Sequence, residues 1–207
     1  MPSRAVAATA AVLGTISGLL LVRAVASAPL TGYVSASGVP GEAHALTYRL
    51  GIYGLALTAA LLACAARSIL TLPLAVAVPM ITVSGAVTCT PGCPLPPYET
   101  TTAQDLVHAT ASVLGVGLCA LAMLAAPGRF SRVAVFVSWP LLAGTAVGML
   151  ATGRGAWTGV LERLGLVACV VWLVGVALAL ARGRSLGGGR SLGGGRSLGG
   201  VRSRYPG

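Results

Sequence analysis

Three side chains of the types used in acid–base and nucleophilic chemistry lie close together in this sequence: Asp105, His108 and Ser112. Their spacing of i, i+3 and i+7 places them on one stripe if the segment is helical. An Asp, a His and a Ser together are typical of a hydrolase, in which the His activates the Ser. A nucleophilic Ser normally sits on a strained turn beside oxyanion donors, whereas Ser112 lies in plain helical sequence. A Ser-dependent membrane hydrolase is therefore an alternative function and not the leading one.

The same groups also suggest a metal site. Carboxylates and imidazoles suit zinc, and four such residues are available: Asp105, His108, His44 and Glu162. No two of them form a diagnostic motif such as HExxH. A metal-dependent hydrolase is thus a second enzymatic alternative, and the sequence assigns no metal ligand and no cofactor.

Two cysteines, Cys89 and Cys93, precede Asp105 in a polar, Pro-rich segment. Such a pair in a loop that faces an oxidising compartment commonly forms a disulfide, which we expect here; a metal site and free thiols are the alternatives. The other cysteines lie inside apolar runs, where a thiol behaves as a small hydrophobic group: Cys64, Cys119 and Cys169.

The composition indicates whether this chain is surrounded by water or by lipid. Hydrophobic residues make up 56% of the sequence and charged residues 9%, whereas soluble domains carry about 25% charged residues. The basic balance would suggest nucleic-acid binding in a soluble chain, but most of the arginines flank apolar segments. We therefore expect the lipid bilayer as the main partner and no nucleic acid.

Six apolar runs predict an all-α bundle of six membrane-spanning helices over residues 1–181: 5–28, 45–66, 69–88, 105–126, 133–152 and 157–181. The first run ends in Ala26-Ser27-Ala28, which is similar to a signal-peptide cleavage site. Its apolar part exceeds the usual h-region of about 7 to 15 residues, and Pro29 would follow the cleavage point. We expect this first helix to be retained.

Residues 182–207 contain three copies of GRSLGG. Their Gly and Ser content predicts a disordered tail, because so few apolar groups cannot offset the entropy of ordering. The tail arginines would attract anionic lipid at about 1 kcal/mol each. A repeat-expanded linker without a task is the alternative.

The predicted spans sort the charges onto two sides. One side carries only basic residues, namely Arg4, Arg67, Arg129, Arg132 and the arginines of the tail. The other side holds all the acidic residues and the remaining cationic ones: Glu42, Glu99, Asp105, Glu162, Arg23, Arg49, Arg154, Arg163, His44 and His108. By the positive-inside rule, both termini are cytoplasmic in a cell membrane.

On the outer side we expect a polar network, with Asp105 and His108 anchored by Arg163 or Arg49, because ionisable groups within a membrane normally pair. Its members are Asp105, His108, Ser112, Glu162, Arg163, Arg49, Arg23 and His44. The network either only fixes the order of the helices or also lines a cavity for a lipid or small amphiphile. Binding without catalysis is the leading function. A transporter is a third class, although the halves of the chain show no repeat.

Two GxxxG steps allow close approach of helices: Gly14/Gly18 and Gly144/Gly148. In a chain with several helices, we expect these steps to pack neighbouring helices of the same chain.

These features together resemble a known family. The six-span layout, a polar loop that enters the fourth span through Asp105-x-x-His108, and Glu162-Arg163 at the start of the last span are similar to bacterial membrane proteins of domain of unknown function 998 (DUF998). The resemblance covers about residues 5–181. It implies six helices and an integral membrane location, and no activity. Similarity to membrane hydrolases that use Ser, Asp and three His is looser, because this chain has 2 His.

Overall fold

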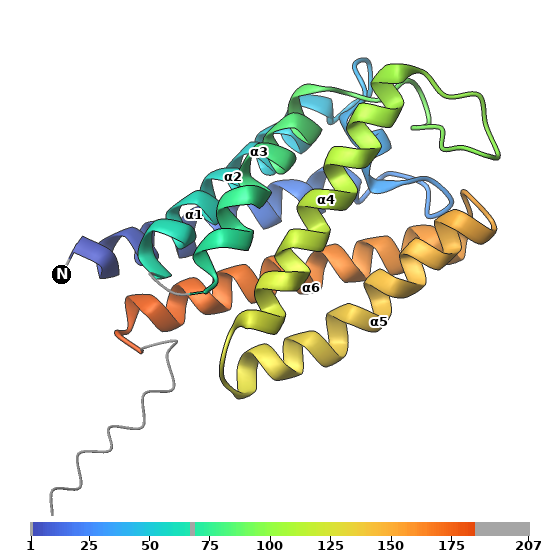
Figure 1. Ribbon diagram of the computed structural model, residues 1–207. Coiled ribbons are helices and arrows are strands. Elements are labelled where there is room, and N and C mark those ends of the chain that lie inside the picture. The colour runs from blue at the N-terminus through green and yellow to red at the C-terminus, as the bar shows by residue number, and fades with distance from the viewer. Residues whose placement is uncertain (1, 67–68, 185–207) are drawn as a thin grey trace, which may run out of the picture.

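The computed structural model describes residues 2–66 and 69–184, and these are helical apart from turns and loops (Figure 1). The helices are α1 (Pro2–Val25), the short 3-10 helix η1 (Val34–Gly38), α2 (Ala45–Ala66), α3 (Thr71–Ala86), α4 (Ala103–Ala125), α5 (Arg129–Ala151) and α6 (Ala156–Ala181). No strand occurs within these ranges. The expected all-α fold is thus confirmed.

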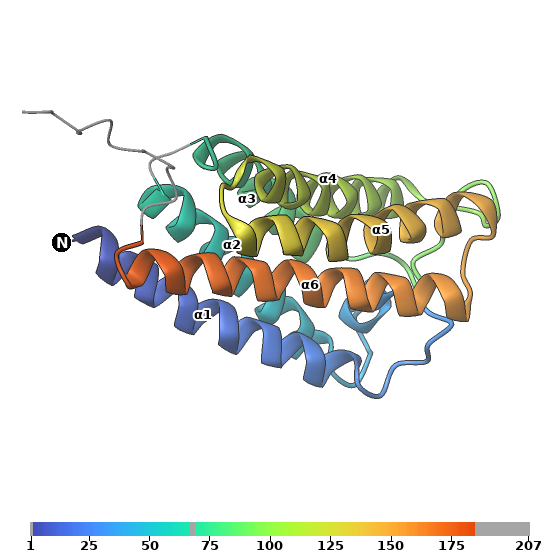
Figure 2. The same ribbon diagram turned by 90° about the horizontal axis from the view of Figure 1, so that it is seen from below.

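Each long helix packs against the next one in the chain, and α6 packs against both α5 and α1. Figure 2 shows α6 lying between α1 and α5. The helices run back and forth, so their connections gather at two ends. We call the end formed by residues 26–44, 87–102 and 152–155 the loop end. The opposite end holds the start of α1, the α4–α5 turn and the end of α6 (Figure 1).

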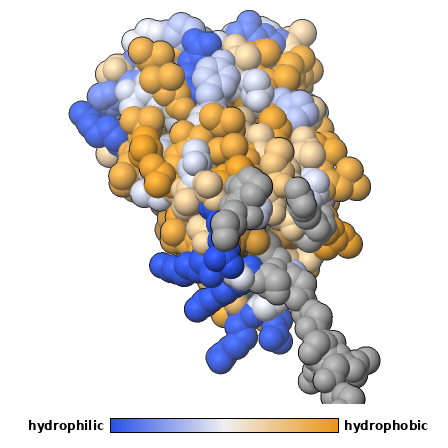
Figure 3. Space-filling view, turned by 90° about the vertical axis from the view of Figure 1, so that its left-hand side faces the viewer, coloured by the Kyte–Doolittle hydropathy of each residue, from blue (hydrophilic) through white to orange (hydrophobic). Residues whose placement is uncertain are grey.

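This opposite end is the arginine end. Its described charged residues are all basic and exposed: Arg4, Arg129, Arg132, Arg182 and Arg184. Figure 3 looks onto this end and shows hydrophilic side chains projecting in the lower part of the view, with hydrophobic residues over much of the rest. The predicted tail begins here, and its residues 185–207 lie outside the described residues, as does Arg67.

Alanines and some large side chains such as Trp172 and Leu62 fill the interior of the bundle, and other large apolar side chains cover its exterior. Ala10, Ala59 and Ala177 are completely buried, while Phe136 is 77% exposed and Leu150 is 74% exposed. In water such an exterior would be costly, whereas lipid tails are as apolar as these side chains. The distribution is that of a multi-pass membrane protein.

By length and composition, five helices can cross a membrane, and α3 is the exception. Its 16 residues extend about 24 Å, against a hydrocarbon core of about 30 Å. We expected this helix over 69–88, but the chain is already extended at Val87 (ψ 99°). The helix continues through Pro79, and α5 likewise continues through Pro140.

The helices α4 and α5 begin two and four residues earlier than their hydrophobic runs predict, and α1 begins three residues earlier. Thr102 caps α4: its side chain accepts a hydrogen bond from the Asp105 N–H, and the Asp105 carboxylate accepts one from the Thr102 N–H. At α5, Gly128 has φ 109° and precedes a helix that already includes Arg129 and Arg132. Glycine tolerates that conformation, so the chain can enter α5 directly after it. The other predicted boundaries agree within about three residues.

Both GxxxG steps pack within the chain. A Cβ atom on Gly18 would approach Val170 of α6 to 2.8 Å, and one on Gly148 would approach the Thr158 hydroxyl oxygen, also on α6, to 2.8 Å. These approaches are closer than ordinary contacts, so glycine is required for α6 to lie this near to α1 and α5.

Gly18→Leu is therefore expected to destabilise the protein by about 1 to 3 kcal/mol, because the new side chain forces α1 away from α6. Thermal unfolding in detergent measures the effect. Gly117→Leu is the matched control, since a Cβ atom there meets nothing within 4 Å. Equal losses of stability in the two variants would contradict this account.

Candidate functional site

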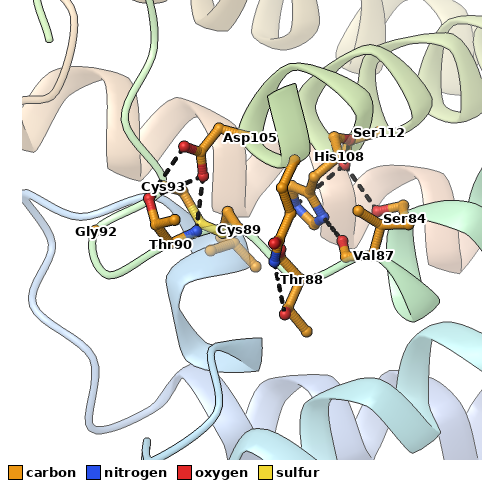
Figure 4. The surroundings of a disulfide bond; sticks show 12 residues. Ser84, Val87, Thr88, Cys89, Thr90, Gly92, Cys93, Asp105, His108 and Ser112 are labelled. Carbon is orange, nitrogen blue, oxygen red and sulfur yellow. Dashed lines mark hydrogen bonds between the residues drawn. A yellow bond between two sulfur atoms is a disulfide. The ribbon is translucent and has the colours of Figure 1, made fainter. Parts of the chain in front are cut away.

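Asp105 joins the start of α4 to the loop of residues 87–102. Its carboxylate accepts hydrogen bonds from the N–H (2.9 Å) and hydroxyl (2.7 Å) of Thr102, and from the N–H (2.7 Å) and hydroxyl (2.9 Å) of Thr90. The residue is 1% exposed. Figure 4 shows the carboxylate directed at Thr90. Its burial is thus offset by backbone and hydroxyl donors.

His108 lies one turn further along α4 and holds the other end of the same loop. Its Nδ1 is 2.7 Å from the Val87 carbonyl oxygen, which only accepts, so Nδ1 carries the proton and Nε2 a lone pair. The Ser112 hydroxyl is 3.5 Å from Nε2, 2.8 Å from the His108 carbonyl oxygen and 2.7 Å from the Ser84 hydroxyl (Figure 4).

This geometry differs from that of a catalytic triad. In a triad the carboxylate bonds to the His nitrogen opposite the nucleophile. Here Nδ1 of His108 bonds to a carbonyl group, and the Asp105 carboxylate bonds to Thr90 and Thr102. These three residues therefore do not form a catalytic triad with one another.

Glu162 and Arg163, in the first turns of α6, hold the loop between α1 and α2. The Glu162 carboxylate accepts a hydrogen bond from the Val34 N–H (2.9 Å). The Arg163 guanidinium donates to the carbonyl oxygens of Pro29 (3.0 Å) and Gly32 (3.2 Å). These bonds fix residues 29–34 across α6.

Arg23 and Arg49, also at the loop end, form hydrogen bonds with groups other than the Asp105 carboxylate. Arg23 donates to Nε2 of His44 (3.1 Å), and Arg49 donates to the Gly85 carbonyl oxygen (3.2 Å). The expectation that Arg163 or Arg49 anchors Asp105 and His108 is thus not met in the described structure. The predicted residues form several separate contacts, and they do not converge on one network.

The only ion pair found within the described ranges joins Arg154 and Glu99. Arg154 also contacts the Gly92 carbonyl oxygen (3.4 Å). It therefore connects the α5–α6 turn to the loop of residues 87–102.

Cys89 and Cys93 are joined by a disulfide, with Cα atoms 5.0 Å apart. A turn between them is closed by a hydrogen bond from the Cys93 N–H to the Thr90 carbonyl oxygen (2.9 Å). Gly92 has φ 87° and Cys93 has φ 52°, so the chain reverses tightly. Both cysteines are buried against Tyr33 and other residues of the α1–α2 loop.

The same pair belongs to a cluster of potential metal ligands. One atom each of Cys89, Cys93 and His108 lie within 4.8 Å of one another, and all three residues are buried. The sequence suggested a different set of ligands. Three of its members, Asp105, His44 and Glu162, lie outside this cluster and form hydrogen bonds with other groups.

A cavity of about 550 Å³ opens at the loop end. It lies between the α1–α2 loop and the residues Gly92, Arg154 and Gly155, and of the predicted site residues only His44 lines it. The hydroxyl oxygens of two lining residues, Tyr33 and Ser37, are buried without a hydrogen-bond partner in the described part of the chain. Both oxygens are covered by neighbouring atoms, so they belong to the wall of the cavity and are not open to its interior.

Tyr33 is the lining residue with the most altered chemistry. Burial raises the pKa of its phenol above the ordinary value, and the nearby Glu162 carboxylate raises it further. The phenol therefore stays protonated well beyond neutral pH and remains a hydrogen-bond donor. Sequence reasoning missed Tyr33, Ser37 and Gly155, because nothing in their spacing marks them.

No protein-family model matches this chain, and neither the curated proteins nor the solved structures include a significant match.

Asp105→Ala should destabilise the protein by about 2 kcal/mol, since the hydrogen bonds from Thr90 and Thr102 and the cap of α4 are lost. Hydrogen exchange should rise mainly in residues 87–104. Thr110→Ala, at an exposed position of the same helix, is the control. Unchanged exchange in that loop would show that Asp105 does not hold it.

Proposed function

We propose that this chain is a six-span protein of the cell membrane whose loop end faces outward and binds the polar head of a lipid or small amphiphile. The loop-end cavity carries the proposal. Its volume falls in the range of about 300 to 1,000 Å³ that is typical of small-molecule sites. The proposal does not require catalysis.

The lining supports a polar head group. His44 and Arg154 offer nitrogen donors, and Glu42 offers a carboxylate. Such a mixed set suits a ligand that both accepts and donates hydrogen bonds.

The surroundings support an apolar tail on the same ligand. Leu30, in the loop between cavity-lining residues, is 55% exposed, and Trp157 at the start of α6 is 78% exposed. Aromatic residues at the end of a span commonly lie at the membrane interface. An amphiphile could thus place its head in the cavity and its chain along the apolar exterior.

The membrane arrangement follows from the two ends of the bundle. The arginine end carries no acidic residue among those described, which favours the cytoplasmic side for both termini. We count α3 as the sixth span, because it packs between α2 and α4 along the same bundle. A short span is accommodated by local thinning of the bilayer. Membership of DUF998 is part of the same proposal, on the resemblance alone.

Gly155→Trp tests the cavity. Gly155 lines it, has an extended backbone (φ 179°), and a Cβ atom there meets nothing within 4 Å, so the indole should enter the cavity without strain. We expect at least a tenfold loss of affinity for a fluorescent short-chain phospholipid, measured by anisotropy in detergent. Native mass spectrometry should show less co-purified lipid.

Gly117→Trp is the matched control, because it adds the same side chain at an exposed position of α4 where a Cβ atom meets nothing within 4 Å. It should leave lipid affinity unchanged. Equal affinity in wild type and Gly155→Trp, with both proteins folded, would reject the cavity as the binding site.

The orientation is tested with reporters. A fusion after Gly207 should report the cytoplasm, and a tag inserted at Gly92 in the loop of residues 87–102 should be accessible from outside intact cells. The opposite result for either reporter would overturn the assignment of the arginine end to the cytoplasm.

A further inference from the structure

We propose that Cys89, Cys93 and His108 form a zinc site when the two cysteines are reduced, and that the disulfide closes this site. One atom of each residue already lies within 4.8 Å of the others. Donors in a tetrahedral zinc site lie about 3.8 Å apart, given Zn–S bonds of about 2.3 Å. Movements of about 1 Å therefore suffice once the sulfurs separate.

His108 is held in the form that binds a metal. Its Nδ1 donates to the Val87 carbonyl oxygen at 2.7 Å, which leaves the lone pair on Nε2. Histidine ligands commonly bond in this way through their second nitrogen to a carbonyl or carboxylate group. Among the described residues, the Ser112 hydroxyl lies 3.5 Å from Nε2, which is too long to engage the lone pair strongly.

The cysteines have the spacing of a zinc-binding turn. Two residues in a C-x₂₋₄-C arrangement commonly supply thiolates to one zinc ion, and Cys89 and Cys93 are separated by 4 positions. The intervening residues already reverse the chain, with a hydrogen bond from the Cys93 N–H to the Thr90 carbonyl oxygen. The turn therefore presents both side chains in one direction.

The charge and type of the ligand atoms favour zinc over other ions. The three ligand residues are buried, with exposed fractions of 3%, 4% and 4%. Two thiolates and a neutral imidazole cancel the charge of Zn²⁺, so the loaded site is neutral where burying a net charge is costly. Thiolate and imidazole donors also suit zinc far better than Mg²⁺ or Ca²⁺. Two thiolates and one imidazole leave a fourth position for water or another ligand.

Reduction of the disulfide and binding of zinc are two separate reactions, and each is balanced. An external dithiol transfers two electrons and two protons to the disulfide, which yields two thiols and one oxidised dithiol. Zn²⁺ then binds both sulfurs and Nε2 of His108 and displaces the two thiol protons to solvent. Exposed Pro91, between the two cysteines, places this turn at the surface of the loop end, so the reagents reach it from outside the bundle.

The test uses the full chain in detergent, reduced with a phosphine that does not bind zinc. Zn²⁺ is titrated in competition with a chromophoric chelator. We expect one equivalent per reduced chain, and at least a tenfold weaker affinity after oxidation, in Cys93→Ser and in His108→Gln. Cys119→Ser and His44→Gln are the controls, since neither residue belongs to the cluster, and both should bind as wild type.

A second measurement needs no variant. Zinc should slow maleimide labelling of Cys89 and Cys93 in the reduced wild-type protein at least tenfold, as mapped by peptide mass spectrometry. Labelling of Cys64, an exposed free cysteine, should not change. Substoichiometric binding to the reduced protein, equal binding to the oxidised protein, or no protection of these two thiols would overturn the proposal.

Discussion

Backbone groups in the loops of a membrane protein must find hydrogen-bond partners near the bilayer, and here charged side chains of the helices supply them. The Glu162 carboxylate accepts a hydrogen bond from the Val34 N–H, and the Arg163 guanidinium donates hydrogen bonds to the carbonyl oxygens of Pro29 and Gly32. The Asp105 carboxylate likewise accepts a hydrogen bond from the Thr90 N–H. A charged group that binds backbone dipoles is satisfied without an opposite charge, and an unpaired backbone group in that setting would be costly.

This use of charge explains why the ionisable groups do not gather in one network. Pairing an Asp with an Arg would have left the backbone of two loops without these partners. By binding backbone, each helix-borne charge instead positions a loop above the bundle. The walls of the cavity follow from this, because Tyr33 and Ser37 belong to the loop that Glu162 and Arg163 fix to α6.

The all-α fold was largely predictable from the sequence, since long apolar runs are local features. The close packing at Gly18 and Gly148 was also predictable, because small residues at helical spacing favour it. The length of α3 was not, since hydropathy does not show where Val87 leaves the helix to meet His108. Partners of the charged residues were predicted least well. A preference for opposite charges says nothing about carbonyl and N–H groups in a loop whose path is unknown.

The cavity and the cysteine cluster share a wall. Gly92 lies between Cys89 and Cys93, lines the cavity, and accepts a contact from Arg154, which lines it too. A Cβ atom on Gly92 would approach this guanidinium to 2.4 Å, so the turn and the Arg154 side chain are packed directly together. Because Arg154 also pairs with Glu99, it is held from both sides of the loop. A rearrangement of the turn on reduction would therefore move a group that faces the cavity, so the state of the cysteines would change the shape of the cavity.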